Sequence, residues 1–405
     1  MPRYETLDTL PALNKTPAGC RVLLRGDLNV PTQNGVVTEA TRIDRLAPTI
    51  IELADRGCKV IVMSHFDRPK GKFVPELSVA PLLAPLRKAL GGREVVFVEN
   101  CIGDATKEAV NDLPNGGIAL LENLRFHPGE EENDANFIKA LASIGDVFVH
   151  DAFSAAHRAH ASTEGIAHVL PSAAGRLMQA ELSALDGALG SPERPMLALV
   201  GGAKVSTKLE VLSNLVSKVD RLVIGGAMAN TFLYALGTDV GASLCEKDMA
   251  DTARAVMVDA DAAGCEVILP SDVVIAERFE AGVPSETVQI AAVRQDAIIL
   301  DIGMHSALAL AESLKECKTV LWNGPLGAFE IRPFDNGTNI VAKAVAKLTA
   351  EGRLRSVAGG GDTVAALAAA KALDDFSYVS TAGGAFLEWL EGKVLPGVAA
   401  LEVKR

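Results

Sequence analysis

The sequence has few cysteines, no excess of basic residues and no long apolar run, and each absence excludes a class of protein. Its 405 residues include six cysteines and no C-x-x-C pair, which argues against a disulfide framework or a zinc site. The net charge of −12 argues against nucleic acid or an anionic membrane as partner. The apolar runs predict no transmembrane helix, and the first residues lack a signal-peptide core. We therefore expect a cytoplasmic protein with no nucleic-acid or membrane partner.

Standard nucleotide-binding and hydrolytic motifs are missing as well. The chain contains neither G-x-x-x-x-G-K-[ST] nor G-x-G-x-x-G, and it has no G-x-S-x-G turn of the kind that carries a Ser-His-Asp triad. His157 and His160 are three residues apart with Arg158 between them, unlike the pair of H-E-x-x-H, so a metal site there is disfavoured. Any phosphate site must therefore follow another design.

The chain does contain a repeated alternation of Val/Ile/Leu-rich runs and helix-like segments. The first series of expected strands comprises residues 21–30, 59–64, 94–99, 117–123 and 146–151. The second series comprises residues 195–202, 221–227, 266–272, 297–303, 319–324, 356–362 and 378–384. Such alternation predicts parallel sheets covered by helices on both faces. Twelve strands are too many for one ordinary sheet, so we expect an α/β protein with two domains.

A boundary between the two domains is expected in residues 170–195, which separate the two series of strands. This stretch contains a helical pattern that ends at Gly190 and Pro192. We expect that helix to connect the domains.

Glycine-rich turns follow the second series of strands. They are "GGAK" (201–204), "GGAM" (225–228), "NGPLG" (323–327), "GGGD" (359–362) and "TAGG" (381–384). Ligands of parallel sheets bind beyond the carboxyl ends of the strands, and glycine lets the backbone approach an anion at the start of a helix. One such turn is explained by tight packing alone, but five on one predicted edge favour a nucleotide site.

Several polar residues of these turns suit a nucleotide. Lys204 and Lys208 are four residues apart, so we expect them on one face near a helix start, either as solvated lysines or as a polyphosphate clamp. Asp362 or Thr363 is expected to cap the helix after "GGGD", and Asp362 beside a phosphate could instead hold Mg²⁺. Glu330 could accept a hydrogen bond from a ribose hydroxyl.

Arginines and histidines gather at the strand ends of the first half. They are Arg25, Arg42, His65, Arg68, Arg125, His157, Arg158 and His160. The planar fork of arginine binds carboxylate and phosphate in a bidentate manner. So many of these residues in an acidic protein indicate a small, multiply anionic substrate, whose hydroxyl Asp27 and Asn29 would orient.

Taken in order, the motifs resemble the phosphoglycerate kinase family over nearly the whole chain. They are "RGDLNVP", "SHFDRP", "ENLRFH", "AFSAAHRAH", "GGAKVSTKLEVL", "WNGPLGAFE", "GGGDT" and "STAGGAFLEWLEGKVLPGV". The resemblance implies reversible phosphoryl transfer from 1,3-bisphosphoglycerate to MgADP, giving 3-phosphoglycerate and MgATP. It implies two Rossmann-like domains joined by a hinge helix. The first, residues 1–175, would bind phosphoglycerate with the tail 390–405 packed back on it, and residues 176–389 would form the hinge helix and the nucleotide domain.

The resemblance also implies roles for individual residues. The phosphoglycerate contacts would be Asp27, Asn29, Arg42, His65, Arg68, Arg125 and Arg158. The nucleotide contacts would be Gly202, Lys204, Lys208, Gly226, Asn323, Glu330, Gly360, Gly361, Asp362 and Thr363. Catalysis would rest on Arg42, Lys204, Gly361 and Gly384. Asp362 would hold Mg²⁺, and we expect a monomer that closes over both substrates.

Three positions depart from the family pattern. Phe66 and Asp67 stand where the family often has leucine and glycine, and Ala382 where a third glycine is common. Asp67 adds negative charge near an anion site.

Two other functions remain open. An NAD-dependent dehydrogenase fits the strand–helix alternation, but the missing G-x-G-x-x-G argues against it. A non-catalytic nucleotide-binding protein would not need the arginines of the first half.

Overall fold

The structure is a computed structural model that describes residues 4–15 and 17–403. The chain divides into two compact units. The first contains the chain up to Leu182 and again from Val394 onward, and the second is Ser183–Lys393. These divisions fall later in the chain than the predicted positions 175 and 390. Which ligand each unit binds stays a prediction. Within the described residues, no helix is long and apolar enough to cross a membrane.

The first unit is built on a six-stranded parallel sheet. Its strands are β1 (Arg21–Arg25), β4 (Lys59–Met63), β5 (Val95–Val98), β6 (Ile118–Leu121), β7 (Val147–His150) and β8 (Ser172–Ala174). Their order across the sheet is β5-β6-β4-β1-β7-β8. All five predicted strands are present but shorter than expected. The sixth, β8, was not predicted, because Ser-Ala-Ala carries little strand signal.

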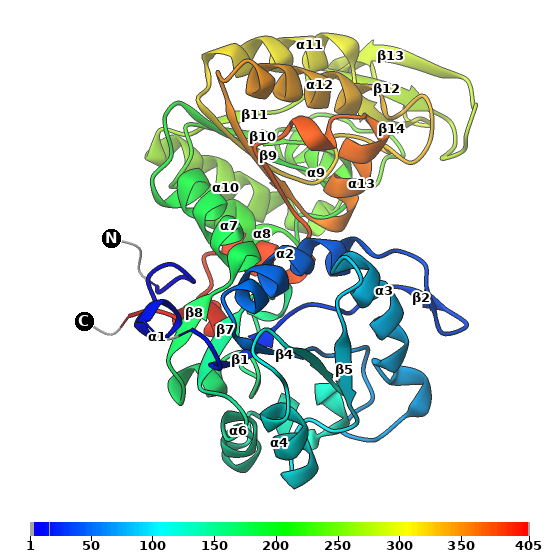
Figure 1. Cartoon of the computed structure of the whole chain (residues 1–405). Helices are drawn as coiled ribbons and strands as arrows, with labels where there is room; N and C mark the ends of the chain where they lie inside the picture. Colours follow the sequence, from blue (N-terminus) through cyan, green and yellow to red (C-terminus); the bar gives the residue numbers. More distant parts are fainter. Residues whose placement is uncertain (1–3, 16, 404–405) are drawn as a thin grey trace. The chain divides into compact units, whose positions relative to one another are not determined.

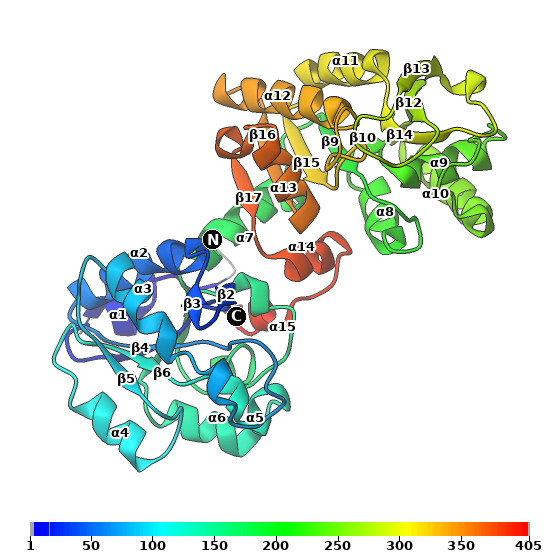
Figure 2. The same ribbon diagram turned by 90° about the vertical axis from the view of Figure 1, so that its right-hand side faces the viewer.

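Helices cover both faces of this sheet (Figures 1 and 2). The helices and the small hairpin of the unit are α1 (Pro11–Lys15), β2 (Thr32–Gln33), β3 (Val36–Val37), α2 (Thr41–Asp55), α3 (Leu83–Ala89), α4 (Asp104–Asn111), α5 (Pro128–Glu131), α6 (Ala135–Ala142) and α15 (Pro396–Ala399). Helices α2 and α3 lie on one face, and α4 and α6 lie on the other (Figures 1 and 2). In α2, Ile43, Leu46, Ile50 and Leu53 recur at helical spacing and are buried. That burial leaves the neighbouring Arg42, in the first turn, at the rim of the sheet.

The second unit contains another six-stranded parallel sheet. Its strands are β9 (Met196–Val200), β10 (Arg221–Ile224), β11 (Glu266–Ile268), β15 (Thr319–Asn323), β16 (Arg355–Gly359) and β17 (Tyr378–Ser380). Their order is β11-β10-β9-β15-β16-β17. The helices are α8 (Leu209–Val216), α9 (Ala227–Ala235), α10 (Ala250–Ala263), α11 (Met304–Ser313), α12 (Asn336–Ala350), α13 (Gly361–Ala369) and α14 (Gly383–Leu390). Helices α11 and α12 pack side by side at the top of Figures 1 and 2. The predicted α/β class with mainly parallel sheets is confirmed.

A small antiparallel sheet in this unit corrects one prediction. It consists of β12 (Asp272–Ala276), β13 (Ser285–Gln289) and β14 (Ile298–Ile302), with β12 in the middle. Residues 297–303 were expected in the parallel sheet, and that placement is wrong. A short apolar run shows that a strand exists but not which strand it pairs with.

The connector between the units is α7 (Arg176–Leu185), followed by a π-helical turn over Asp186–Gly190. Its first turn is held by carboxylates. Oδ1 of the buried Asp151 accepts the backbone N–H of Met178 at 3.0 Å. Arg176 forms salt bridges of 2.6 Å with Asp8 and Glu52. Strand β8 lies at the start of the stretch 170–195 in which the boundary was expected, and it belongs to the first unit.

We expect Asp151 to make the stability of the protein fall between about pH 4 and pH 6. Burial raises the pKa of Asp151 to about 6, from an ordinary value of 3.8. The folded state therefore binds a proton more tightly than the unfolded state, so this stabilisation is present below pH 4 and is lost as the pH rises through 6. An upper estimate of the loss is about 3 kcal/mol. Urea unfolding from pH 4 to pH 7 should show Asp151→Asn gaining stability relative to the parent by about 2–3 kcal/mol. Parallel pH profiles would contradict the assignment.

Candidate active site

A basic cavity of about 150 Å³ lies at the carboxyl edge of the first sheet. The loops after β1, β4, β6 and β7 form it. Its lining residues are Asn29, His65, Asp67, Arg68, Arg125, Ser154, Ala155, His157, Arg158 and His160. We call this cavity the arginine cup. Of the seven residues predicted to contact the acid, five line it, and the other two, Asp27 and Arg42, adjoin it.

Hydrogen bonds fix the loop after β1 against its neighbours. Nη1 of Arg42 lies 2.9 Å from Oδ2 of Asp27 and donates to the carbonyl oxygen of Asn29 at 2.9 Å. Oδ1 of Asp27 accepts the N–H of Asn29 at 3.1 Å. The side-chain oxygen of Asn29 accepts the N–H of Asp67 at 3.0 Å. The cup is thus held in shape by its own polar groups.

Arg25 does not act as the sequence suggested. It was grouped with arginines of the loops, but it is the last residue of β1 and is 1% exposed. It donates to Oγ of Ser162 at 2.9 Å and to Nδ1 of His65 at 3.0 Å. A guanidinium can only donate, so Nδ1 accepts and the neutral ring of His65 carries its proton on Nε2. Arg25 therefore orients His65 through this hydrogen bond and does not itself line the cup.

Two histidines of the cup, His65 and His160, add no positive charge to it at neutral pH. Burial, and then the nearby Arg25 and Arg125, lower the pKa of His65 well below its ordinary value. Burial and the same arginines lower the pKa of His160 to about 4. Both rings are neutral at pH 7, so Arg68, Arg125 and Arg158 carry the charge that attracts an anion.

The sequence assigned no role to one hydroxyl of the cup. Ser154 lines the cavity, and its Oγ donates to Oδ2 of Asp27 at 2.5 Å. It lies in a helical turn, Phe153–Ala155, beyond the end of β7. A lone serine carries no chemical signature, and only its position after a parallel strand could have indicated it.

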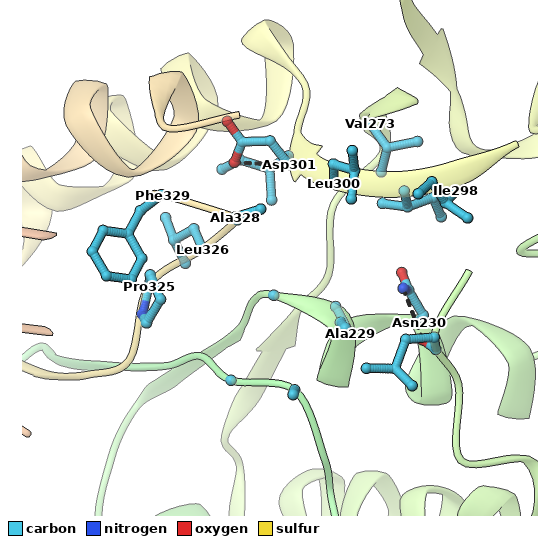
Figure 3. A pocket seen from close by; sticks show the side chains of 18 of the residues that line it. Ala229, Asn230, Val273, Ile298, Leu300, Asp301, Pro325, Leu326, Ala328 and Phe329 are labelled. Carbon is cyan, nitrogen blue, oxygen red and sulfur yellow. Dashed lines mark hydrogen bonds between the residues drawn. The ribbon is translucent and has the colours of Figure 1, made fainter. Parts of the chain in front are cut away.

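A larger, mainly apolar cavity of about 470 Å³ lies in the second unit (Figure 3). Four predicted nucleotide residues line it: Gly202, Gly226, Glu330 and Asp362. Figure 3 shows one wall with Val273, Ile298, Leu300 and Asp301, another with Ala229 and Asn230, and the loop Pro325–Phe329 between them. The first of these walls comes from β12 and β14. The antiparallel sheet that the sequence did not reveal therefore shapes this cavity.

Asp301 is a buried acid of the cavity wall, and no motif in the sequence marks it. Burial raises the pKa of Asp301 to about 8. Its oxygens accept the N–H groups of Ile302 at 2.9 Å and of Gly337 at 2.7 Å. At pH 7 the carboxyl group is therefore mainly neutral, and the wall keeps its low charge.

The glycine turns serve different purposes. A Cβ at Gly226 would lie 2.6 Å from the carbonyl oxygen of Gly202, and one at Gly324 would lie 2.1 Å from that of Gly201. Close approach of a neighbouring backbone requires glycine at both positions, whether or not a ligand is bound. Gly361 differs, since a Cβ there would have no atom within 4 Å and its φ lies outside the left-handed region. Its lack of a side chain leaves space for a ligand at the first residue of α13.

Alanine substitutions should separate these two purposes. Gly361→Ala should fold with unchanged stability but raise the KM for nucleotide about tenfold or more, because the methyl group occupies the approach to the helix start. Gly226→Ala should lose about 2 kcal/mol or more of stability, because alanine is strained at its φ of 67° and clashes with Gly202. Steady-state kinetics and thermal unfolding of both variants check this. Normal nucleotide affinity in Gly361→Ala would contradict the assignment.

Two local predictions about the glycine turns are wrong. Helix α8 begins at Leu209 with Lys208 as its N-cap, so Lys204 and Lys208 precede the helix instead of sharing its face. Helix α13 has Gly360 as its N-cap and no capping side chain, so neither Asp362 nor Thr363 caps it. The Oγ1 of Thr363 instead accepts the N–H of Gly324 at 2.7 Å and so joins two of the turns.

The lysines and Asn323 have distinct settings. Nζ of Lys208 donates to Oδ1 of Asn323, and burial lowers the pKa of Lys208. Nδ2 of Asn323 donates to the carbonyl oxygen of Gly359 at 2.8 Å. Lys204 is exposed and forms no salt bridge with any residue that the structure describes. Its charge is therefore available to a ligand.

Known proteins match this chain over nearly its full length. A profile of the family described as phosphoglycerate kinase matches residues 14–393. A phosphoglycerate kinase of Chelativorans sp. (strain BNC1) is 60% identical over 402 residues, which cover 99% of this chain and 100% of that protein. The structure of phosphoglycerate kinase from Coxiella burnetii has 41% identity, a TM-score of 0.90 and 98% coverage of both chains. That from Pyrococcus horikoshii OT3 has 28% identity, a TM-score of 0.79 and the same coverage.

The chain belongs to the phosphoglycerate kinase family. The resemblance inferred from the motifs is confirmed, and so is the expected class of enzyme, a phosphotransferase of glycolysis. The dehydrogenase and the non-catalytic nucleotide-binding protein are therefore rejected as alternatives. The roles of individual residues stay predictions.

Two departures from the phosphoglycerate kinase motifs have a structural explanation. Phe66 is buried and its side chain belongs to the hydrophobic core of the first unit, while its N–H and carbonyl oxygen bond to the side chain of Asn123 at 3.1 and 2.8 Å. Ala382 is the N-cap of α14 with φ of −90°, which any residue can adopt. Neither change alters a group assigned to chemistry.

Proposed function

We propose that the chain transfers a phosphoryl group directly and reversibly between 1,3-bisphosphoglycerate and ADP, giving 3-phosphoglycerate and ATP. The observation that carries this proposal is the presence of two cavities of opposite character in one chain. The arginine cup of the first unit suits a small, multiply charged acid. The cavity of the second unit suits the base of a nucleotide, because its lining is mainly apolar. Glycine turns and helix starts near its mouth suit the phosphates.

In the arginine cup, Arg68, Arg125 and Arg158 would bind the phosphate of the acid. Arg125 is pre-positioned, since its Nη1 donates to the carbonyl oxygen of Asp67 at 2.7 Å. The carboxylate of Asp27 and the amide of Asn29 would orient the hydroxyl group of the acid. His65, protonated on Nε2, would donate one hydrogen bond.

In the second unit, Gly202 and Gly226 would let the nucleotide lie against the backbone, and Glu330 would accept from a ribose hydroxyl. Lys208 would contact the phosphates near Asn323. The first N–H groups of α13, at Gly361, would bind phosphate oxygens.

The carboxylate of Asp362 is a suitable ligand for a Mg²⁺ ion. It is an exposed carboxylate of the cavity lining and forms no salt bridge among the described residues. Mg²⁺ is commonly held by one or two carboxylates and by phosphate oxygens. When bound, the ion supplies positive charge to the polyphosphate.

Phosphoryl transfer needs positioning and charge neutralisation, and no nucleophile of the protein is required. In the direction of ATP use, a carboxylate oxygen of 3-phosphoglycerate forms a bond to the γ-phosphorus as the bond from that phosphorus to the β,γ-bridging oxygen breaks, and ADP leaves. Arg42 and Lys204 would neutralise the charge on the transferring group. The N–H groups at Gly361 and Gly384 would add fixed donors.

Direct transfer requires the two bound substrates to meet, and each proposed site lies in its own unit. We expect closure when both substrates are bound, with hinges in α7 and where the chain returns at Val394. Closure within one chain favours a monomer and would exclude water from the transfer. As a glycolytic enzyme the protein is expected in the cytoplasm.

Formation of ATP from 1,3-bisphosphoglycerate and ADP tests the activity. Direct transfer also predicts no exchange of label between ADP and ATP when phosphoglycerate is absent, because no phosphorylated enzyme forms. Failure to form ATP would overturn the proposed reaction. Label exchange without the acid would overturn direct transfer alone.

A further inference from the structure

The lining of the arginine cup includes the carboxylate of Asp67. Among the described residues, it is the only acidic side chain in the lining of the cavity. Its backbone is held in the left-handed region, with φ of 51°. The N–H of Asp67 donates to Oδ1 of Asn29 at 3.0 Å, and its carbonyl oxygen accepts from Nη1 of Arg125 at 2.7 Å. These two bonds fix the place of the residue, while its side chain remains exposed.

Few acidic groups balance the charge of the arginines that line the cup. Within the part of the chain that the structure describes, Arg68 and Arg158 form no salt bridge, and Arg125 lies 3.3 Å from Glu131. His65 and His160 are neutral at pH 7, because burial and the nearby arginines lower the pKa of each ring. Asp67 therefore adds an exposed negative charge to the lining of the cavity, next to the arginines that attract the anion.

We propose that Asp67 sets the affinity of the cup, because its negative charge weakens the binding of anions in proportion to their charge. This inference rests on the proposed function for the identity of the acid. A phosphoglycerate carries about three negative charges at pH 7, so its binding is opposed more strongly than that of a divalent anion such as sulfate. The same repulsion favours release of the acid after transfer.

Asp67→Asn tests the charge with little change in shape. Asparagine adopts the left-handed region readily, so the backbone bonds to Asn29 and Arg125 are kept. Titration calorimetry of the full chain should show 3-phosphoglycerate binding about three- to tenfold more tightly in this variant at low salt. Inorganic sulfate should bind more tightly by a smaller factor, and ADP affinity should not change. The gain for 3-phosphoglycerate should shrink as salt is added.

Asp112→Asn is the matched control. It changes the net charge by the same amount, but Asp112 is exposed at the end of α4, which runs back to the opposite edge of the sheet from the cup. Its affinities should equal those of the parent. Equal gains in both variants would mean a general charge effect and would overturn the proposal.

The outcomes separate this inference from the proposed function. Unchanged or weaker 3-phosphoglycerate binding in Asp67→Asn would overturn the inference, and weaker binding would indicate that Asp67 accepts a hydrogen bond from the acid. If the parent does not bind 3-phosphoglycerate, the proposed function fails, and sulfate titration still tests Asp67. Sulfate binding that is unchanged by Asp67→Asn would then overturn the inference as well.

Discussion

Replacing Lys204 by alanine is expected to lower kcat by about 10²–10³-fold without unfolding the protein. The side chain is exposed and has no salt bridge among the described residues, so folding does not depend on it. The turn that carries it is held by other groups. The N–H of Ser206 donates to Glu246 at 3.0 Å, and Oγ1 of Thr207 donates to the carbonyl oxygen of Lys204 at 3.0 Å. The loss would therefore be a loss of charge at the transferring group.

A coupled assay in both directions measures this effect, and unfolding curves check the fold. Lys343→Ala is the control, because Lys343 is an exposed lysine on α12 of the same unit and lies outside the cavity lining. It should keep full activity. If Lys204→Ala also turned over at the parent rate, the proposed role of Lys204 would be wrong.

Replacing Arg42 by alanine should lower kcat by a similar factor, about 10²–10³-fold, although Arg42 lies in the other unit. Asp27 keeps the N–H of Asn29 and the hydroxyl of Ser154 as partners, so the loop after β1 should hold its shape. Arg42→Lys should not restore activity, because a lysine lacks the planar fork that can hold Asp27 and a phosphoryl oxygen together.

Arg93→Ala is the control for this variant. Arg93 forms an exposed salt bridge of 2.7 Å with Asp55, and such a pair contributes little. Its kcat should match that of the parent. Near-normal turnover in Arg42→Ala would show that Arg42 only supports Asp27 and does not act on the transferring group.

The strand–helix alternation could be predicted from the sequence because buried parallel strands are continuously apolar. The pairing of those strands with one another could not be predicted in the same way. The run at 297–303 looks like the others, yet β14 pairs antiparallel with β12. The pairing depends on contacts between residues far apart in the chain. The wall of the larger cavity was therefore unpredictable, although its glycine turns were visible.

The site showed the same limit at the level of single residues. Arginines at strand ends indicated an anion site, because parallel strands bring their carboxyl ends together. The sequence could not tell that Arg25 is buried while Arg68 faces the cavity. The sequence also does not distinguish Gly226 from Gly361, but only at Gly226 does a neighbouring backbone leave no room for a side chain.

The most direct measurement of the central claim is a crystal structure of the chain with 3-phosphoglycerate and a non-hydrolysable ATP analogue bound together. We expect the acid among Arg68, Arg125 and Arg158, the triphosphate at the start of α13, and the carboxylate of the acid aligned with the γ-phosphorus. The acid bound among the glycine turns, or the two ligands held too far apart for transfer, would contradict the account.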